Sequence, residues 1–301
     1  MRRLIRIVAY GLVTLVVLAI GVVGIAWWRT DVALTRVYTL ADVKLDVRGD
    51  PAQVERGRHL AVTRGCTDCH GDDLAGRVVI DAGPVGIFVS ANLTPAGAGK
   101  GTDANLFEHA VRHGVGRDGR PLRFMPATDF AGMDDDDVAA LYAYVRTVPP
   151  ASRQLPETWI GPLGRVLYLF DRVPILLTAE TVDHAAASAP RAAPVAAATA
   201  EYGRYLAMGC TGCHGERFAG GRIPGAPPDL PLAANLTPDP TGLGVWSEAD
   251  FMRAIREGKR PDGSDIDPFM PWKSLGQMTD TELRALYADL HSLPPLPSGA
   301  R

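Results

Sequence analysis

The chain contains 301 residues, of which 47% are hydrophobic and 22% are charged, and its formal net charge at neutral pH is −3. This length accommodates two domains of ordinary size together with connecting segments. The slightly acidic balance disfavours a nucleic-acid partner, whose phosphates attract clusters of Lys and Arg.

The N-terminus predicts a membrane anchor. A basic head, residues 1–6, precedes an uncharged run from Ile7 to Trp28. Such a run is long enough to cross a hydrocarbon core of roughly 30 Å, which needs ~20 helical residues. Trp27 and Trp28 end the run where aromatic side chains favour the membrane interface. We therefore expect residues 1–29 to span the bacterial cytoplasmic (inner) membrane, with a cytoplasmic N-terminus and a periplasmic body.

A cleaved signal peptide is the alternative, with the small residues Gly24 and Ala26 near its cleavage site. Cleavage there would leave two tryptophans at the new N-terminus, so the retained anchor is favoured. Both interpretations export the rest of the chain. Residues 30–50 mix charged and isolated apolar side chains. They are expected to form a stalk, in which residues 38–47 form a short strand or pack on the first domain.

Each half of the chain contains a C-x-x-C-H motif, at residues 66–70 and at residues 210–214. This motif is the attachment signature of c-type haem, because two thiols on one helical turn can bond one porphyrin and the next histidine can bind its iron. Disulfides, redox motifs and zinc knuckles share part of this spacing. Two copies that use all four cysteines favour two covalently attached haem c groups. The predicted cofactor-binding residues are Cys66, Cys69, His70, Cys210, Cys213 and His214.

The chain is an internal duplication. Four further segments recur at offsets between 143 and 146 positions. The matched segments are 57–61 with 203–207, 91–95 with 234–238, 124–126 with 269–271, and 140–143 with 285–288. Two homologous domains are therefore predicted, residues 51–150 and residues 199–297, joined by a connector over residues 151–198.

Each repeat predicts a small helical domain, so the expected fold class is all-α, with two tandem domains after the transmembrane helix. The expected helices are 52–64, 103–113 and one beginning at Asp134, then 200–208, 248–257 and one beginning at Thr279. Thr279 and Glu282 have the spacing of a capping box. The acidic run 134–137 is typical of a helix N-terminus, which is favoured over a calcium site.

The connector contains an apolar segment, residues 159–177. Packing across the two domains is the favoured interpretation, and contact with the membrane surface or with a partner is the alternative. Residues 185–200 are rich in Ala and Pro and predict a linker.

The second axial ligand of each iron is expected to recur at the same place in both repeats. This requirement sets aside the histidines without a histidine counterpart, which are His59, His109, His113, His184 and His291. Two pairs of methionines do match.

The local sequence separates the two methionine pairs. Met133 and Met278 directly precede predicted helix N-caps, where a hydrophobic staple explains them. Met125 and Met270 lie in loops, each before a proline, and follow the haem histidines by 55 and 56 residues. Met125 and Met270 are therefore the predicted iron ligands, opposite His70 and His214.

Further positions follow from the repeat. An imidazole that binds iron needs an acceptor for its other N–H, commonly a backbone carbonyl, and Pro84 and Pro227 occupy matching places for it. The candidates for contacts with haem propionates are Arg77, Arg222, Asn92, Asn235, Trp246 and Trp272.

The chain resembles the membrane-anchored cytochrome c subunits of periplasmic dehydrogenases of the alcohol, aldehyde or gluconate type. The resemblance covers residues 51–297 and rests on C-x-x-C-H, Ala-Asn-Leu-Thr-Pro and Phe-Met-Pro, in that order in both halves. It implies domains similar to class I cytochromes c, whose His/Met haems pass electrons from a dehydrogenase to quinone or an oxidase. Well-known members have three haem domains and a C-terminal anchor, whereas this chain has two and an N-terminal anchor.

We therefore expect an electron carrier in a periplasmic respiratory or dehydrogenase-linked chain, and not an enzyme. His/Met ligation leaves no open position at the iron and raises its reduction potential. The expected partners are redox proteins at the membrane surface: a dehydrogenase, a quinol-linked complex or an oxidase. The main rival is a haem enzyme, such as a di-haem peroxidase or a thiosulfate-oxidising cytochrome. A redox or gas sensor and a double zinc protein are less favoured.

Overall fold

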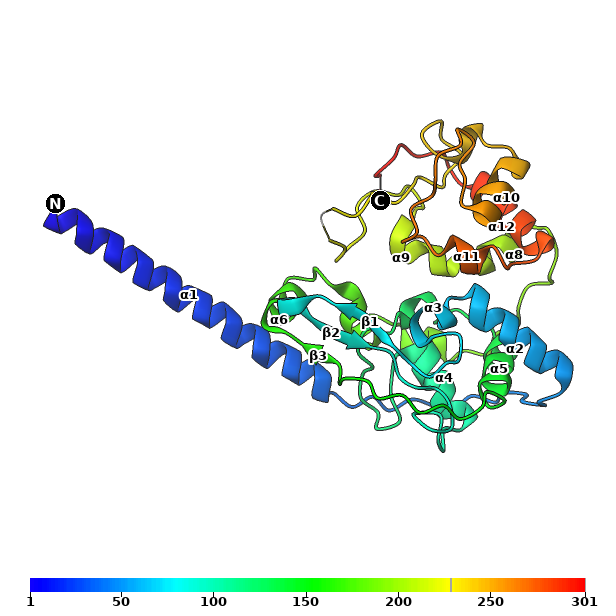
Figure 1. The fold of residues 1–301 in the computed structure, drawn as a ribbon, viewed down its shortest axis with the longest axis horizontal. Helices are drawn as coiled ribbons and strands as arrows, with labels where there is room; N and C mark the ends of the chain where they lie inside the picture. The colour runs from blue at the N-terminus through cyan, green and yellow to red at the C-terminus, as the bar shows by residue number, and fades with distance from the viewer. Residues whose placement is uncertain (228, 301) are drawn as a thin grey trace.

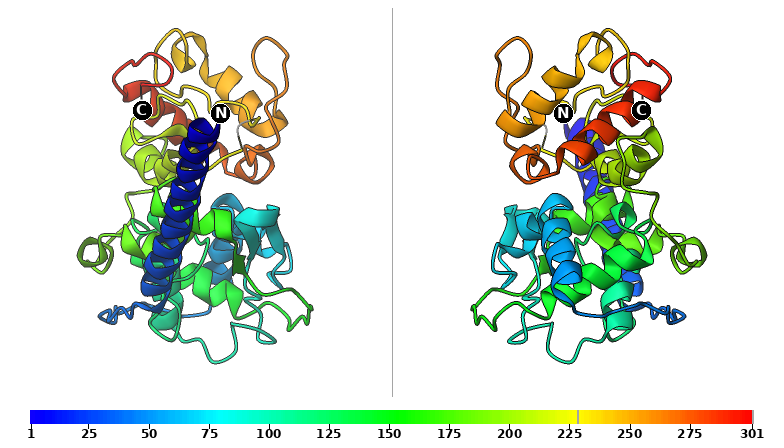
Figure 2. Two further views of the ribbon diagram at one scale, coloured as in Figure 1. Left: turned by 90° about the vertical axis from the view of Figure 1, so that its left-hand side faces the viewer. Right: turned by 90° about the vertical axis from the view of Figure 1, so that its right-hand side faces the viewer.

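The computed structural model describes residues 1–227 and 229–300. A long N-terminal helix, α1 (Arg2–Thr35), projects from one side of the molecule (Figure 1). The first domain lies at the C-terminal end of α1, and the second domain rests on the first, as the two side views also show (Figure 2).

Helix α1 continues beyond the predicted anchor to Thr35. By length and composition it is able to cross a membrane. Most of its apolar side chains are exposed, whereas Ala26, Thr30 and Ala33 are buried in the part of α1 that packs on the connector. Residues 36–50, all of them described, form neither helix nor strand. The optional strand is therefore absent, and this segment instead packs on the first domain, where the Tyr38 N–H donates to a carbonyl 2.8 Å away.

The main helices of both repeats lie where the sequence predicts them. The first domain contains α2 (Pro51–Thr63), α3 (Cys66–His70), α4 (Ala104–His113), η2 (Ala127–Asp129) and α5 (Asp135–Val145). The second contains α8 (Ala200–Leu206), η4 (Ala207–Cys210), α9 (Thr211–His214), η5 (Leu243–Val245), α10 (Glu248–Glu257), α11 (Trp272–Leu275) and α12 (Asp280–Ser292). The elements η2, η4 and η5 are short 3-10 turns.

Side-chain caps explain where the last helix of each domain begins. The Asp134 carboxylate accepts a hydrogen bond from the Asp137 N–H at 2.9 Å. In the second domain the Thr279 N–H donates to the Glu282 carboxylate at 2.7 Å, and the Glu282 N–H donates to the Thr279 hydroxyl oxygen at 3.2 Å. The predicted helix start and the predicted capping box are both confirmed.

The all-α expectation is wrong in one respect, because the first domain contains a small antiparallel sheet. Its strands, in the order β1-β2-β3, are β1 (Val78–Asp81), β2 (Gly86–Val89) and β3 (Trp159–Ile160). The first two strands flank the turn η1 (Gly83–Val85) in a loop rich in Gly and Pro. The third strand belongs to the connector and lies some seventy residues later, so no local pattern announces the pairing.

The connector packs mainly on α1 and the first domain, and not across the two domains as favoured from the sequence. After β3 it forms α6 (Pro162–Leu169), η3 (Pro174–Glu180) and α7 (His184–Ala187). Its buried side chains Ile160, Tyr168 and Leu176 share one core cluster with Ala33 of α1 and Phe88 of β2.

One glycine in each domain permits the closest helix crossing. A Cβ atom added to Gly57 would lie 1.9 Å from the Ala140 carbonyl oxygen, where α2 crosses α5. The equivalent Gly203 would meet the Ala285 carbonyl oxygen at the same distance, where α8 crosses α12. Real side chains do not approach a backbone atom this closely, so the helices of both domains pack backbone to backbone.

We expect Gly203→Ala to destabilise the second domain by about 2–3 kcal/mol, because α8 and α12 must move apart and the core between them loosens. The measurement is chemical denaturation of the haem-loaded full chain. Gly209→Ala is the matched control, since no atom lies within 4 Å of the added Cβ. Equal effects of the two changes would show that the crossing is not the cause.

Candidate haem centres

Both C-x-x-C-H motifs form a short helical turn that ends at the histidine. The first is α3 and the second is η4 followed by α9. All four cysteines are present as thiols, with half-buried side chains. The two motifs therefore present the same set of groups, as the duplication predicts.

The histidine of each motif is oriented by a backbone carbonyl. His70 Nδ1 lies 2.8 Å from the Ala91 carbonyl oxygen, and His214 Nδ1 lies 2.8 Å from that of Ala234. A carbonyl only accepts, so Nδ1 carries the proton and Nε2 keeps its lone pair for a metal. Burial lowers the pKa of His70, and the hydrogen bond that its Nδ1–H donates to the Ala91 carbonyl acts in the opposite direction.

The predicted acceptors, Pro84 and Pro227, are wrong. Pro84 lies in η1, and its carbonyl oxygen faces Gly161, where an added Cβ would approach it to 2.2 Å. The true acceptors directly precede the repeated Asn-Leu-Thr-Pro sequence. The sequence contained this signal, because Ala91 and Ala234 head the longest segment that recurs after the motifs.

The asparagines after these alanines hold the acceptor loop in place. The Asn92 amide donates to the Ala151 carbonyl at 2.7 Å, and its oxygen accepts from the Thr94 N–H at 2.9 Å. In the second domain Asn235 makes the same pair of bonds, to Leu296 at 2.7 Å and from the Thr237 N–H at 3.0 Å. Both side-chain amides therefore form hydrogen bonds with the backbone of their own domain. This gives the two asparagines a structural role in place of the expected contact with haem propionates.

The other propionate candidates lie in different settings. Arg77 and Arg222 are exposed. Trp246 packs on the core of the second domain, and its carbonyl accepts from the Tyr287 hydroxyl at 2.9 Å. Trp272 lies against Gly258, where an added Cβ would come within 2.5 Å of its ring.

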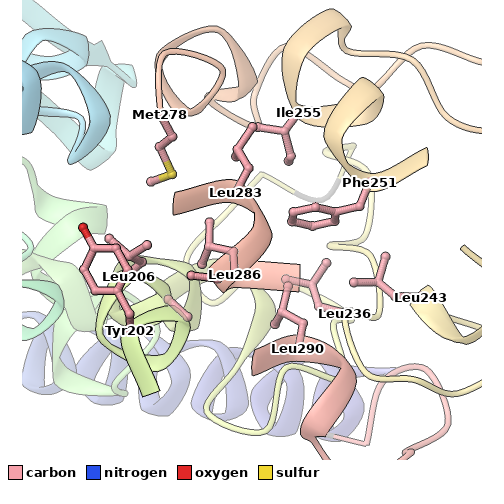
Figure 3. Packing of buried hydrophobic residues seen from close by; sticks show 12 residues of the cluster. Tyr202, Leu206, Leu236, Leu243, Phe251, Ile255, Met278, Leu283, Leu286 and Leu290 are labelled. Carbon is pink, nitrogen blue, oxygen red and sulfur yellow. The ribbon is translucent and has the colours of Figure 1, made fainter. Parts of the chain in front are cut away.

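The two methionine pairs differ in burial. Met133 and Met278 are 0% and 3% exposed, and each lies in the main core cluster of its domain. Met278 belongs to the same cluster as Leu283, four positions into α12 (Figure 3). This arrangement is what a hydrophobic staple requires.

Met125 and Met270 are half-buried and lie in loops. The Met125 loop is tied to the connector: the Thr178 hydroxyl donates to the Met125 carbonyl at 2.6 Å, and the Phe124 N–H donates to the Leu176 carbonyl at 2.9 Å. Phe124 has a positive φ of 60° and stacks on Phe88. A bulky residue in this conformation is strained, so the packing of the connector holds this loop in position.

The thiols fit covalent haem better than the alternatives. Burial raises the pKa of Cys66 to about 12 and that of Cys210 to about 11, whereas redox-active C-x-x-C motifs have lowered thiol pKa values. Within residues 1–227 and 229–300, no group of three or more His, Cys, Asp or Glu is arranged to hold a metal ion. The raised thiol pKa values therefore disfavour a dithiol redox centre.

Each motif lies at the domain interface and faces the other domain through equivalent contacts. Between the cysteines of the first motif, the Asp68 carboxylate accepts a hydrogen bond from Ser274 of α11 at 2.6 Å. Between those of the second, a Cβ added to Gly212 would lie 3.2 Å from the carboxylate of Asp129 in η2. Asp68 is equivalent to Gly212 in the repeat, and Ser274 is equivalent to Asp129.

A second pair of contacts between the two domains also joins equivalent residues. His59 of α2 lies 2.9 Å from the Glu282 carboxylate in the first turn of α12. Its counterpart Tyr205 donates to the carboxylates of Asp134 and Asp137, at 2.5 and 2.6 Å, where α5 begins. In a two-fold interface, residue i of one unit contacts residue j of the other, and residue j of the first contacts residue i of the second. The two domains are thus related by an approximate two-fold axis, and the haem motifs lie at their contact.

Sequence reasoning missed these interface residues. His59 was set aside because its counterpart is a tyrosine, yet both side chains perform the same task. A signal was available in the sequence. The equivalent positions 59 and 205 both carry polar side chains, and the equivalent positions 137 and 282 both carry carboxylates. Burial at the interface also raises the pKa of Asp129 to about 6.

We expect Tyr205→Phe to destabilise the docked domains by about 1.5–3 kcal/mol, the usual value of a hydrogen bond to a charged group. The change leaves two carboxylates without their shared donor, and both are only 1% exposed. Thermal unfolding of the haem-loaded chain measures this loss. Tyr202→Phe is the control on the same helix, because its hydroxyl is 3.5 Å from the nearest carboxylate. A loss no larger than that of the control would contradict the role given to Tyr205.

Comparison with known proteins agrees with this geometry. The sequence model of the cytochrome c family matches residues 54–149 and residues 200–294. The chain is 34% identical over 285 residues to the cytochrome c subunit of the quinone alcohol dehydrogenase of Gluconacetobacter polyoxogenes, covering 82% of this chain and 57% of that subunit. It is 31% identical to the gluconate 2-dehydrogenase cytochrome c subunit of Pantoea cypripedii, covering 82% of this chain and 61% of that subunit.

A di-haem cytochrome c of Cereibacter sphaeroides matches over a larger share of its own length. The identity is 27% over 286 residues, which cover 83% of this chain and 91% of that protein. The chain thus spans less than two thirds of the dehydrogenase subunits but nearly all of the di-haem protein. With two matched domains and two C-x-x-C-H centres, the chain belongs to the cytochrome c family and carries two covalently attached haem c groups.

Proposed function

We propose that this protein is a membrane-anchored electron carrier that serves a periplasmic dehydrogenase, and that it is not itself a catalyst. The observation that carries the proposal is that two equivalent haem motifs both lie at a two-fold interface between the domains. The contacts Asp68–Ser274 and His59–Glu282, together with those of Tyr205, hold the two motifs in a fixed relation. A fixed relation between two redox centres suits electron transfer, because little has to rearrange.

Eight side chains are proposed to hold the two haems. Cys66 and Cys69 attach the first and Cys210 and Cys213 the second, through thioether bonds. Nε2 of His70 or His214 would bind each iron, and the sulfur of Met125 or Met270 would supply the second protein ligand. A haem held in this way supplies a one-electron Fe(III)/Fe(II) couple with a raised potential.

Residues of the chain orient the proposed ligands of each iron. The Ala91 and Ala234 carbonyls fix the tautomer and the plane of the histidine rings. Met133 and Met278 are occupied in the cores, which leaves the second methionine pair for the irons. Both irons then have six ligands, and this favours the carrier over the enzyme rival.

Location and partners follow from the N-terminus and from the relatives. Arg2, Arg3 and Arg6 precede the apolar part of α1, so the N-terminus is proposed to be cytoplasmic and the haem domains periplasmic. Relatives named as subunits of alcohol and gluconate dehydrogenases support a dehydrogenase as electron donor. A quinone-linked complex or an oxidase is the proposed acceptor.

The test is purification of the full chain, with its haems attached, from bacterial membranes under conditions that preserve complexes. We expect two haems per chain, two one-electron reduction steps and a co-purifying dehydrogenase whose substrate reduces both haems. Rapid carbon monoxide binding to either reduced haem, or turnover of peroxide by the wild type, would instead favour the enzyme. Recovery of the chain in the soluble periplasmic fraction would contradict the anchor.

A further inference from the structure

The short helix α6 presents its apolar side to the outside of the molecule. Leu163 and Phe170 are 43% and 56% exposed, and Trp159, just before the helix, is 50% exposed. Val166 and Leu167 lie between them on the same helical face and are half-buried. The opposite face packs inward through Gly164 and Tyr168. This orientation reverses the usual pattern of a surface helix, whose apolar face points to the core.

Helix α6 is bound to a defined part of α1. The Arg165 guanidinium donates to the Asp31 carboxylate at 2.6 Å and to the Trp27 carbonyl at 3.4 Å. It also lies over the Trp27 ring, 4.7 Å from its centroid. Between these two residues of α1, Arg29 pairs with Glu180 at 3.1 Å. α6 therefore lies beside residues 27–31, as the side-by-side helices of Figure 1 show.

Residues 27–31 of α1 coincide with the end of the membrane-spanning run. The uncharged residues 7–28 of α1 extend over about 33 Å at 1.5 Å per residue, close to the roughly 30 Å of a hydrocarbon core. The first charges after this run are Arg29 and Asp31, and α6 is bound next to them. If α1 crosses the membrane, α6 lies at the level of the lipid headgroups.

We propose that Trp159, Leu163 and Phe170 form a second membrane contact, which lies on the outer surface of the same bilayer that α1 crosses. The proposal rests on the membrane anchoring proposed above. Lipid is the occupant that the position requires, because α6 is bound beside the end of the apolar run of α1, where Trp28 is itself 66% exposed. Aromatic and aliphatic side chains at this depth favour the interface. The contact holds the first domain on the membrane surface and prevents α1 from acting as a free tether.

The test uses nitroxide labels on the full, haem-loaded chain in lipid nanodiscs, where thioether bonds occupy the native cysteines. Leu163→Cys and Phe170→Cys report on the patch. Leu15→Cys reports on the apolar run of α1, and Val245→Cys, at a 74% exposed apolar residue of the second domain, reports on water. Microwave power saturation compares collisions with oxygen, which is concentrated in lipid, with collisions with a nickel chelate, which is confined to water. An unchanged haem spectrum verifies that each variant is folded.

We expect the labels at 163 and 170 to give oxygen-to-nickel ratios between those at 15 and 245, and clearly above that at 245. A ratio at both patch positions equal to that at 245, with lipid-like values at 15, would overturn the membrane contact and leave the anchor intact. Protection of the patch labels from both reagents would indicate a protein partner and would also overturn it. Water-like values at position 15 would overturn the anchoring itself.

Discussion

Met270→Ala is expected to remove the sixth ligand of the second haem and to leave the first haem unchanged, and Met125→Ala should do the reverse. Loss of a methionine ligand lowers the reduction potential of an iron and opens a coordination position. Each variant should therefore lose half of the weak red absorption band that marks methionine bound to ferric haem. One of its two reduction steps should move to lower potential, and one haem should bind carbon monoxide when reduced.

The other methionine pair supplies the matched controls. Met133→Leu and Met278→Leu conserve volume in the core and should cost less than about 1.5 kcal/mol. They should leave the absorption band and both potentials unchanged. Loss of the band in these variants, or its full retention in Met125→Ala and Met270→Ala, would reverse the assignment of the ligands.

The potential of the second haem is expected to fall as pH rises through about 6. Asp129 faces the second motif, and burial raises its pKa to about 6. Below that pH the carboxyl is neutral. Above it the negative charge favours ferric iron, which carries one more positive charge than ferrous, so the potential decreases. The equivalent residue facing the first motif is Ser274, which does not titrate in this range.

The size of this change follows from the Coulomb energy. A unit charge at a separation on the order of 10 Å and an effective dielectric constant of about 20 contributes about 1.7 kcal/mol. This corresponds to roughly 70 mV for one electron, at 59 mV per tenfold change in equilibrium constant. Redox titrations between pH 5 and about 8 measure it. Asp129→Asn should abolish the pH dependence of the second haem around pH 6 and keep its potential at the low-pH value. A pH dependence that persists in this variant would mean that another group is responsible.

Predictions that rest on neighbours in the sequence agree with the structure. The turns of both haem motifs and the helix starts at Asp134 and Thr279 depend on bonds between residues within about four positions of one another. The repeat added a second constraint, because a role had to suit both halves. That constraint favoured Met125 and Met270 as iron ligands over His59, and this remains a prediction. It did not reveal that an imidazole at position 59 and a phenol at position 205 fill equivalent places at the domain interface.

The failures involve residues that are distant along the chain. The histidine N–H reaches a carbonyl about twenty residues later, and the sheet is completed by a strand from the connector. The connector was expected between the domains, yet it lies against α1. In each case several loops could supply a carbonyl, a strand edge or an apolar surface, and only the packing selects one.

The sequence by itself determined that the chain attaches two haems in duplicated domains behind an apolar N-terminal helix, because spacing, capping and hydropathy are local or repeated properties. Only the tertiary structure decided that the two motifs both lie at an approximate two-fold interface between the domains, with Asp129 facing one and Ser274 contacting the other. It also decided that α6 lies beside the end of the apolar run. These relations depend on contacts between residues 68 or more positions apart, and such contacts leave no periodic signal in the chain.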